Sequence, residues 1–264
     1  MTATALHADV PTPMRDRPAS IATLSTVELR KATDTRAGRW LLIVLALIAL
    51  GGLAIGVFAV PSQNRTYATM SQIVFNLVGL ILPVVGILLV TSEWSQRSAL
   101  TTFSLVPRRS RVLVAKLVAG LVLAVAGWLV AFGLAVLGTA LASRPGGLLP
   151  GAAVWGLSVH SVLQGLLYLV LAMFGGMAFG LLFLNSAAAI VVNFVLPTVW
   201  TIVSSLVPGL RDVQPWLDPA RTWGRLLDAD LPGRGWAQVL TTAAVWILLP
   251  GAVGAYRMLT REVS

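Results

Sequence analysis

The chain has 264 residues, of which 57% are hydrophobic and 11% are charged, whereas soluble domains of this size usually carry about 25% charged residues. Composition therefore predicts a membrane protein. The net charge of +9 could suggest a nucleic-acid partner, but the basic residues flank apolar runs, so we expect none. The lack of cysteine excludes disulfides, thiolate metal sites and cysteine nucleophiles.

Residues 1–20 lack apolar periodicity and contain three prolines, which predicts a disordered tail. Residues 21–264 are expected to form a single membrane domain. We expect no signal peptide, because 39 mostly polar residues precede the first apolar run, which is long enough to span.

Ser25-Thr-Val-Glu28 has capping-box spacing, and Arg30 and Lys31 follow. These residues predict a short interfacial elbow helix, with its cations near anionic headgroups. The alternative is a frayed extension of the first span.

Six apolar segments follow, and each reaches the ~20 residues needed to cross ~30 Å of hydrocarbon. They cover about residues 40–60, 70–90, 112–142, 152–184, 187–207 and 236–256. The predicted fold class is all-α, a polytopic membrane protein with six transmembrane helices. Two Gly-x-x-x-Gly patterns, Gly52 to Gly56 and Gly176 to Gly180, predict close helix packing.

Orientation follows from the positions of Arg and Lys. Thirteen of them lie in the tail, the 91–111 loop, the adjoining start of the third span and the C-terminal end, and six lie in the other connections. The positive-inside rule places both termini and the 91–111 loop in the cytoplasm. The link around Asn185-Ser186 is then a very short cytoplasmic turn.

The longest outer connection covers residues 208–235. Asp218-Pro219 is a good helix start, Trp223, Leu226 and Leu227 share a face, and Leu231-Pro-Gly is expected to stop the helix. This pattern predicts an amphipathic or re-entrant segment on the outer membrane surface. It could be an exit gate or an ordinary interfacial anchor.

The sequence contains neither a nucleotide-binding site nor an ion-coupling relay that could supply energy for transport. Its two lysines follow no Gly-rich loop, so the phosphate-binding pattern is absent, and no acid lies deep in the spans to form an ion relay. Lys116 lies close enough to the inner edge to snorkel. With two histidines and no paired carboxylates deep in the spans, the sequence lacks the residues that a membrane hydrolase or a metal site would need. We therefore expect no enzyme, no metal site and no cofactor bound by this chain.

Polar residues fall at helical spacing in several spans, where they must face protein or water. Interhelical hydrogen bonding is favoured for His160 and Gln164 in the stripe that continues to Tyr168. In the second and fifth spans, hydrogen bonding and the lining of a substrate path stay open alternatives, because proline kinks accompany the polar groups. The candidate path residues are Gln72, Asn76, Asn193, Thr201 and Ser205.

The 91–111 loop carries a helical pattern of its own. Residues 98–105 can form a short helix with apolar knobs at Leu100, Phe103 and Val106, and Pro107 ends it. Such a helix along the cytoplasmic face would present the knobs to a groove in a partner protein. The alternative is an ordinary loop with positive-inside charge.

Five short motifs resemble the permease subunits of type-2 ABC exporters, the class that includes multidrug, lipid and polysaccharide export systems. They are Glu28-Leu-Arg-Lys31, Ser92-Glu-Trp94, Leu100-Thr-Thr-Phe103, Val106-Pro-Arg-Arg109 and Ala115-Lys116. The resemblance implies that residues 98–105 form a coupling helix, which seats in a cleft of a separate ATPase subunit and is flanked by Glu93 and Arg108. It assigns the coupling site to Glu93, Ser98, Leu100, Thr101, Thr102, Phe103, Pro107, Arg108 and Arg109.

The resemblance also implies a bacterial inner-membrane transporter of two permeases and two ATPases. ATP and Mg would bind the ATPase subunits, the second permease would be a copy or a paralogue, and spans two and five would line the path. Because no aromatic stripe for sugars is evident, the expected cargo is a hydrophobic or amphipathic drug, lipid or peptide. The alternatives are an ATPase-coupled scaffold or sensor without transport and, less favoured, a membrane-embedded enzyme.

Overall fold

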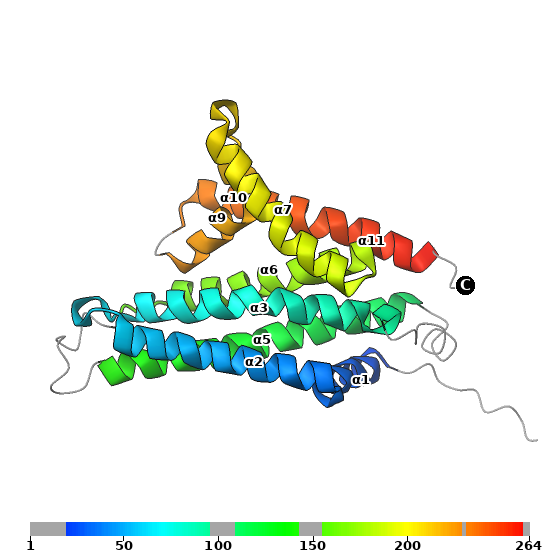
Figure 1. The fold of residues 1–264 in the computed structure, drawn as a ribbon, viewed down its shortest axis with the longest axis horizontal. Coiled ribbons are helices and arrows are strands. Elements are labelled where there is room, and N and C mark those ends of the chain that lie inside the picture. Colours follow the sequence, from blue (N-terminus) through cyan, green and yellow to red (C-terminus); the bar gives the residue numbers. More distant parts are fainter. Residues whose placement is uncertain (1–19, 96–108, 143–154, 229–230, 261–264) are drawn as a thin grey trace, which may run out of the picture.

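The computed structural model describes residues 20–95, 109–142, 155–228 and 231–260 (Figure 1). In these ranges the secondary structure is helical and includes no strand. Six helices are long and apolar enough to cross a membrane, which makes the chain a multi-pass membrane protein. They cover Arg36–Ala59, Tyr67–Trp94, Arg109–Ala142, Val159–Phe183, Ser186–Leu206 and Gly233–Thr260.

Most elements follow directly from the apolar runs. Helix α1 (Ile21–Asp34) precedes α2 (Arg36–Ala54), which continues as the π turn η1 (Ile55–Ala59). After the 3-10 turn η2 (Ser62–Asn64) come the long helices α3 (Tyr67–Ser95), α5 (Arg109–Ala142), α6 (Val159–Phe183) and α7 (Ser186–Leu206). The last span consists of α10 (Gly233–Ala243), the π turn η5 (Ala244–Leu248) and α11 (Leu249–Thr260).

Between α7 and α10 the connection folds into four short helical pieces. They are η3 (Pro208–Leu210), α8 (Gln214–Leu217), α9 (Pro219–Gly224) and η4 (Arg225–Leu227). We call residues 214–228 the cap segment. The predicted helix start is confirmed, because Asp218 accepts a hydrogen bond from Arg221 N at 3.0 Å and Pro219 follows it. The predicted stop is wrong, since α9 already ends at Gly224 and Pro232 instead caps the start of α10.

The six predicted spans are all confirmed, with shifted ends. The fourth begins at Val159 and not near residue 152, because residues 156–158 are not helical and Ser158 forms a capping box with Ser161. The short turn between α6 and α7 is also confirmed. It contains Leu184 in the left-handed conformation (φ 51°) and Asn185, whose side chain accepts from Ala188 N at 3.0 Å.

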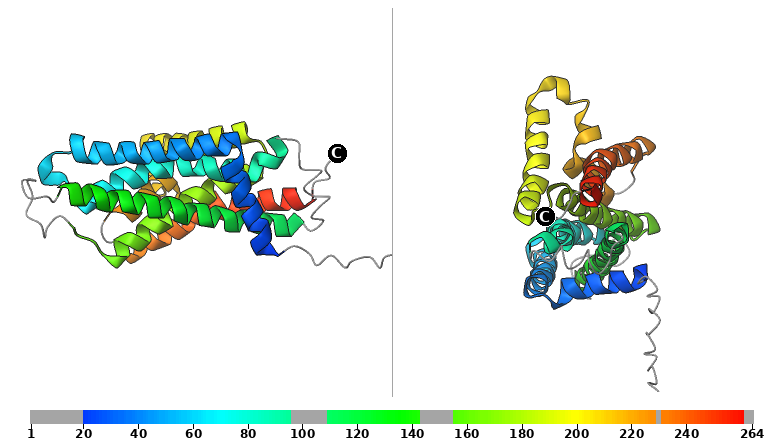
Figure 2. Two further views of the ribbon diagram at one scale, coloured as in Figure 1. Left: turned by 90° about the horizontal axis from the view of Figure 1, so that it is seen from below. Right: turned by 90° about the vertical axis from the view of Figure 1, so that its right-hand side faces the viewer.

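Helix α1 is a separate helix and not an extension of the first span. Its N-cap is Ser20, which accepts from Thr23 N at 3.1 Å, so the predicted capping box at Ser25 and Glu28 is wrong. Both residues are buried inside the helix. Thr35 has an extended backbone and caps α2 by accepting from Gly38 N at 3.1 Å. The chain therefore turns here, and α1 crosses the ends of the spans (Figure 2).

Helices α3 and α6 form the tightest contact of the bundle. A Cβ atom at Gly176 would collide with the backbone of Pro83, and one at Gly180 would lie 3.2 Å from Ile87 Cα. The other glycine pair, Gly52 and Gly56, also faces α3, where an added Cβ would meet the side chains of Leu77 and Met70. Both predicted close-packing patterns are thereby confirmed, and α3 is the helix that they share.

Helix α7 stands apart from the others. Figure 1 shows it leaning away from the bundle formed by α2, α3, α5 and α6. Its first turns pack through Ala189 against Ile87, Phe179 and Trp246. Further along, its apolar side chains are exposed, including Val191, Val195, Val199 and Ile202. In a membrane this face meets either lipid or another protein.

The α3–α6 contact yields a stability prediction. Gly176→Ala should cost about 1–3 kcal/mol, because the added methyl group meets backbone that cannot move aside. Gly133→Ala is the matched control, since a Cβ there meets nothing within 4 Å and alanine is the better helix former. Thermal unfolding in mild detergent would measure both. Equal melting temperatures for the two variants would contradict the packing argument.

Candidate functional site

Four charged side chains meet where α1 crosses the spans, and we call them the charge cluster. Glu28 and Lys31 come from α1, Glu93 from the last turn of α3, and Lys116 from two turns inside α5. Lys116 is 0% exposed, Glu93 2% and Glu28 4%. Charges this deeply buried must be paired, because desolvation of an isolated one is very costly.

The pairing is complete for both ammonium groups. Lys116 Nζ donates to Glu28 Oε2 at 2.7 Å and to the carbonyl of Leu89 at 2.9 Å, and it lies 3.4 Å from Glu93 Oε1. Lys31 Nζ lies 2.7 Å from Glu28 Oε1 and 3.1 Å from Glu93 Oε1. Acids and bases thus alternate around a closed ring of zero formal charge. Three helices are joined by these ion pairs, in which Lys116 and the two carboxylates are enclosed and the Lys31 side chain is 39% exposed.

The pairing also fixes the charge state of the α1 members. Burial alone would raise the pKa of Glu28, but the ammonium of Lys116, and then that of Lys31, outweigh this effect and hold the pKa below its ordinary value. Burial alone would lower the pKa of Lys31, but Glu28 and then Glu93 raise it above its ordinary value. Both groups therefore stay charged at every physiological pH.

The structure changes the roles expected for these residues. The predicted snorkelling of Lys116 is wrong, because its ammonium points into the protein and is fully buried. Glu93, expected beside the ATPase contact, directs its carboxylate into the cluster, and its part in coupling stays a prediction. Of the expected elbow residues, Glu28 and Lys31 belong to the cluster, whereas Arg30 lies exposed on α1.

Sequence reasoning missed the cluster, although a signal was present. Glu93 and Lys116 each stand at the edge of an apolar run, where a charge that becomes buried needs a partner of opposite sign. The spacing from Glu28 to Lys31 also allows a pair one turn apart. What the pattern could not supply was the partner of each charge, since Glu28 and Lys116 are 88 residues apart.

Two members of the charge cluster flank the expected coupling helix in the sequence: Glu93 precedes it and Lys116 follows it. Ser98, Leu100, Thr101, Thr102, Phe103, Pro107 and Arg108 lie outside the described residues. Arg109 begins α5 and donates to the carbonyl of Met258 in α11 at 3.3 Å. On the other flank, Thr91 and Ser186 share a hydroxyl hydrogen bond of 2.8 Å, which joins α3 to α7. The helices that enter and leave residues 96–108 are therefore tied to α1, α7 and α11.

The polar residues expected along a path in α3 are hydrogen-bonded to neighbouring elements. Gln72 Nε2 donates to Asp228 Oδ1 at 3.0 Å, and so reaches the cap segment. Asn76 accepts from the Tyr168 hydroxyl of α6 at 3.3 Å. His160 is exposed while Gln164 is buried, so the predicted stripe on α6 does not share one environment.

The fifth span is joined to the same cap segment. The Thr201 hydroxyl lies 2.9 Å from Asp218 Oδ2, and Asp218 is 0% exposed. Ser205 is exposed and donates to the carbonyl of Ile202 at 2.7 Å, and Asn193 is half-buried. The two candidate path stripes are thus both connected to the cap segment, Gln72 through Asp228 and Thr201 through Asp218.

The cap segment is also held by the last span. Trp223 Nε1 donates to the Thr242 hydroxyl at 3.0 Å, and Trp246 Nε1 donates to the carbonyl of Leu217 at 2.8 Å. Arg225 donates to Gln238 Oε1 at 3.0 Å. The prediction that this connection is not a free loop is therefore confirmed.

The described residues do not meet the requirements of a metal site. Within the described ranges no group of three or more His, Asp or Glu could hold a metal ion. No family model matches the chain, and no curated protein matches it. The class of protein is therefore set by the fold alone: a multi-pass, all-α membrane protein, with a buried charge cluster at one end and a hydrogen-bonded cap segment at the other.

The charge cluster yields a second prediction. Glu28→Gln should cost about 3–5 kcal/mol, because it leaves the buried ammonium of Lys116 with only the more distant carboxylate of Glu93. Asp34→Asn is the matched control, since it removes one acid from an exposed position of the same helix. Thermal unfolding in detergent compares the two. A Glu28→Gln protein as stable as the control would show that the cluster does not stabilise the fold.

Proposed function

We propose that this chain is the membrane-spanning permease subunit of an ATP-driven ABC exporter. It would move a hydrophobic or amphipathic drug, lipid or peptide out across the bacterial inner membrane. The observation that carries the proposal is the charge cluster. It fixes α1 to α3 and α5, the two helices that flank the segment with the expected coupling motif.

This arrangement suits the transmission of force. A partner that moves residues 96–108 would pull on the end of α3 and the start of α5. The charge cluster binds these two helices to α1. Helices α1, α3 and α5 would therefore move together as one rigid body. Breaking a buried pair costs several kcal/mol, so the cluster stays closed during the cycle. A rigid block of this kind can couple two states of the transporter.

The energy would come from a partner. The chain carries no Gly-rich phosphate loop and no acid deep in its spans. In the proposed complex, ATP and Mg bind separate ABC ATPase subunits, and this chain binds no cofactor and catalyses no reaction itself. Residues 98–105 would seat in the ATPase cleft, with Phe103 as the central apolar anchor and with Arg108 and Arg109 beside it.

The proposed substrate path runs beside α3 and α7, towards the cap segment. In the described state Gln72 and Thr201 hold this segment through Asp228 and Asp218. An outward-open state would need these hydrogen bonds to break. Their net contributions are modest, ~0.5–1.5 kcal/mol each and somewhat more with a charged partner, so opening is affordable within one ATP cycle. The cap segment would then be the gate.

The remaining parts of the proposal concern topology and assembly. By the positive-inside rule, the excess of Arg and Lys would put both termini and the 91–111 loop in the cytoplasm. Helix α1 would lie along that membrane face as the elbow helix. A second permease, either a copy or a paralogue, would complete the membrane part, and the uncovered apolar face of α7 is a surface where it could pack. Lipid covers the rest, and nucleic acid has no role.

The coupling role leads to a third prediction. Phe103→Asp, or charge reversal at Arg108 and Arg109, should reduce co-purification with the ATPase at least ~10-fold, because an apolar anchor at an interface typically contributes 2 kcal/mol or more. Arg211→Glu at the cap end is the control and should leave the complex intact. Pull-down from mild detergent gives the measurement, and thermal unfolding shows that the spans remain folded.

Two results separate the alternatives. If Phe103→Asp retains the ATPase and its stimulation, the coupling role is wrong. If the reconstituted complex hydrolyses ATP but no hydrophobic cargo stimulates it or crosses the membrane, the chain is an ATPase-coupled scaffold or sensor.

The path residues give a fourth prediction. Gln72→Ala and Asn76→Ala should change the transport rate several-fold while the complex still assembles, because Gln72 holds the cap segment and Asn76 lies one turn further along the same stripe of α3, beside the proposed path. Thr241→Ala is the control, since its hydroxyl bonds only within its own helix. Transport into vesicles and thermal unfolding are measured together. A loss of melting temperature with unchanged transport would assign the two residues to structure alone.

A further inference from the structure

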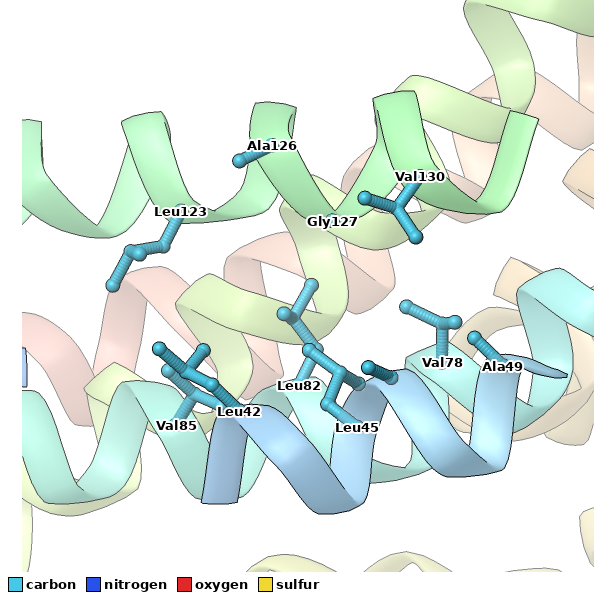
Figure 3. Close-up of a pocket in the computed structure, with 11 residues that line it drawn as sticks. Leu42, Leu45, Ala49, Val78, Leu82, Val85, Leu123, Ala126, Gly127 and Val130 are labelled. Atoms are coloured by element: carbon cyan, nitrogen blue, oxygen red, sulfur yellow. The ribbon is translucent and has the colours of Figure 1, made fainter. Parts of the chain in front are cut away.

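An apolar cavity lies among α2, α3 and α5 (Figure 3), and no member of the charge cluster or of the cap segment lines it. Its volume is about 160 Å³. Leu45 and Ala49 of α2, Val78 and Leu82 of α3, and Ala126 and Gly127 of α5 line it, and the rest of the lining is apolar as well. No polar side chain takes part.

The cavity opens sideways, between α2 and α5. Ala49, Val78, Leu82 and Gly127 form its buried floor, whereas Ala46 and Ala126 at its mouth are exposed. The mouth exists because small residues stand on both helices where larger ones would close the gap. Since α2 and α5 are membrane spans, this mouth faces the hydrocarbon of the bilayer.

The lining selects the chemistry of the occupant. A water molecule would find no hydrogen-bond partner there, and apolar cavities of ~150 Å³ stay dry yet accept benzene or xenon. The space therefore suits a hydrocarbon segment of about six carbons. A longer flexible chain could enter through the mouth with its remaining length in the membrane.

Helix α2, which forms one wall of the cavity, also carries Arg39 on the same stripe as Ala46 at the mouth. Arg39, Leu42, Ala46 and Ala49 follow one another at helical spacing and so share one stripe of α2. Arg39 is exposed, about 10 Å along the helix axis from Ala46 at 1.5 Å per residue. That is the distance at which a headgroup phosphate stands from the middle of its own acyl chain, since half the hydrocarbon layer is ~15 Å thick.

We infer that this groove binds one acyl chain of an anionic membrane phospholipid, whose phosphate pairs with Arg39. The inference is independent of the proposed export activity, because it depends only on α2, α3 and α5. A lipid chain held here would fill the cavity among α2, α3 and α5. It would also fasten α2 to α5 close to where α1 crosses both helices.

The test uses the full chain in nanodiscs and two photoactivatable lipids with the same mid-chain diazirine, phosphatidylglycerol and phosphatidylcholine. Mass spectrometry of the labelled peptides reads the position. We expect labelling at residues 42–49 and 123–130, with phosphatidylglycerol favoured about fivefold, since one cation near an anionic group contributes ~1 kcal/mol. Arg39→Gln should abolish the preference, and Arg39→Lys should keep it.

A second part of the experiment blocks the mouth of the cavity with larger side chains. Ala126→Phe should remove the labelling at both segments, whereas Ala140→Phe, an exposed position further along α5, should not. Ala46→Leu closes the mouth from the other helix, so agreement between the two filling variants excludes misfolding as the cause. Labelling that survives both variants would come from lipid around the whole protein and would overturn the groove. A fivefold preference that persists in Arg39→Gln would overturn the assigned headgroup contact.

Discussion

The structure depends first on the burial of one ammonium group. Lys116 is completely enclosed, and an unpaired charge in that position would cost more than the fold could tolerate. Its anions come from α1 and α3, so both helices must approach α5 closely at this end. The crossing of α1, the turn at Thr35 and the burial of Glu28 all follow from that requirement.

The two ends of the molecule are held by interactions of different strength. At the α1 end, buried ion pairs join three helices, and removing one partner leaves another charge unsatisfied. At the opposite end, the cap segment is fastened by separate hydrogen bonds from Gln72, Thr201 and Trp223. Each of these hydrogen bonds contributes about 0.5–3 kcal/mol net, with the larger values where the acceptor is a carboxylate. A rigid end and an openable end are what the proposed exporter requires, with force entering at the first and cargo leaving at the second.

Packing within the bundle adds a further contrast. Helices α3 and α6 touch backbone to backbone through Gly176 and Gly180, whereas α2 and α5 leave a groove between them. The α3–α6 pair is therefore the fixed core of the membrane region. The α2–α5 side has space that a hydrocarbon chain can fill. Helix α7 is joined to the core mainly through its first turns, which leaves most of its apolar surface for lipid or for another protein chain.

By itself, the sequence determined the elements whose causes are local. Runs of ~20 apolar residues define the six spans, and Asp218-Pro219 defines the start of α9, because each needs only neighbouring residues. Local pattern failed at the start of α1, because Ser25 and Glu28 have capping-box spacing but lie buried inside a helix that begins after Ser20. Only the tertiary structure decided that Lys116 is buried and not snorkelling, that Glu93 faces inward, and that a groove separates α2 from α5. Charge pairing across 88 residues depends on how helices cross, and no local pattern encodes that crossing.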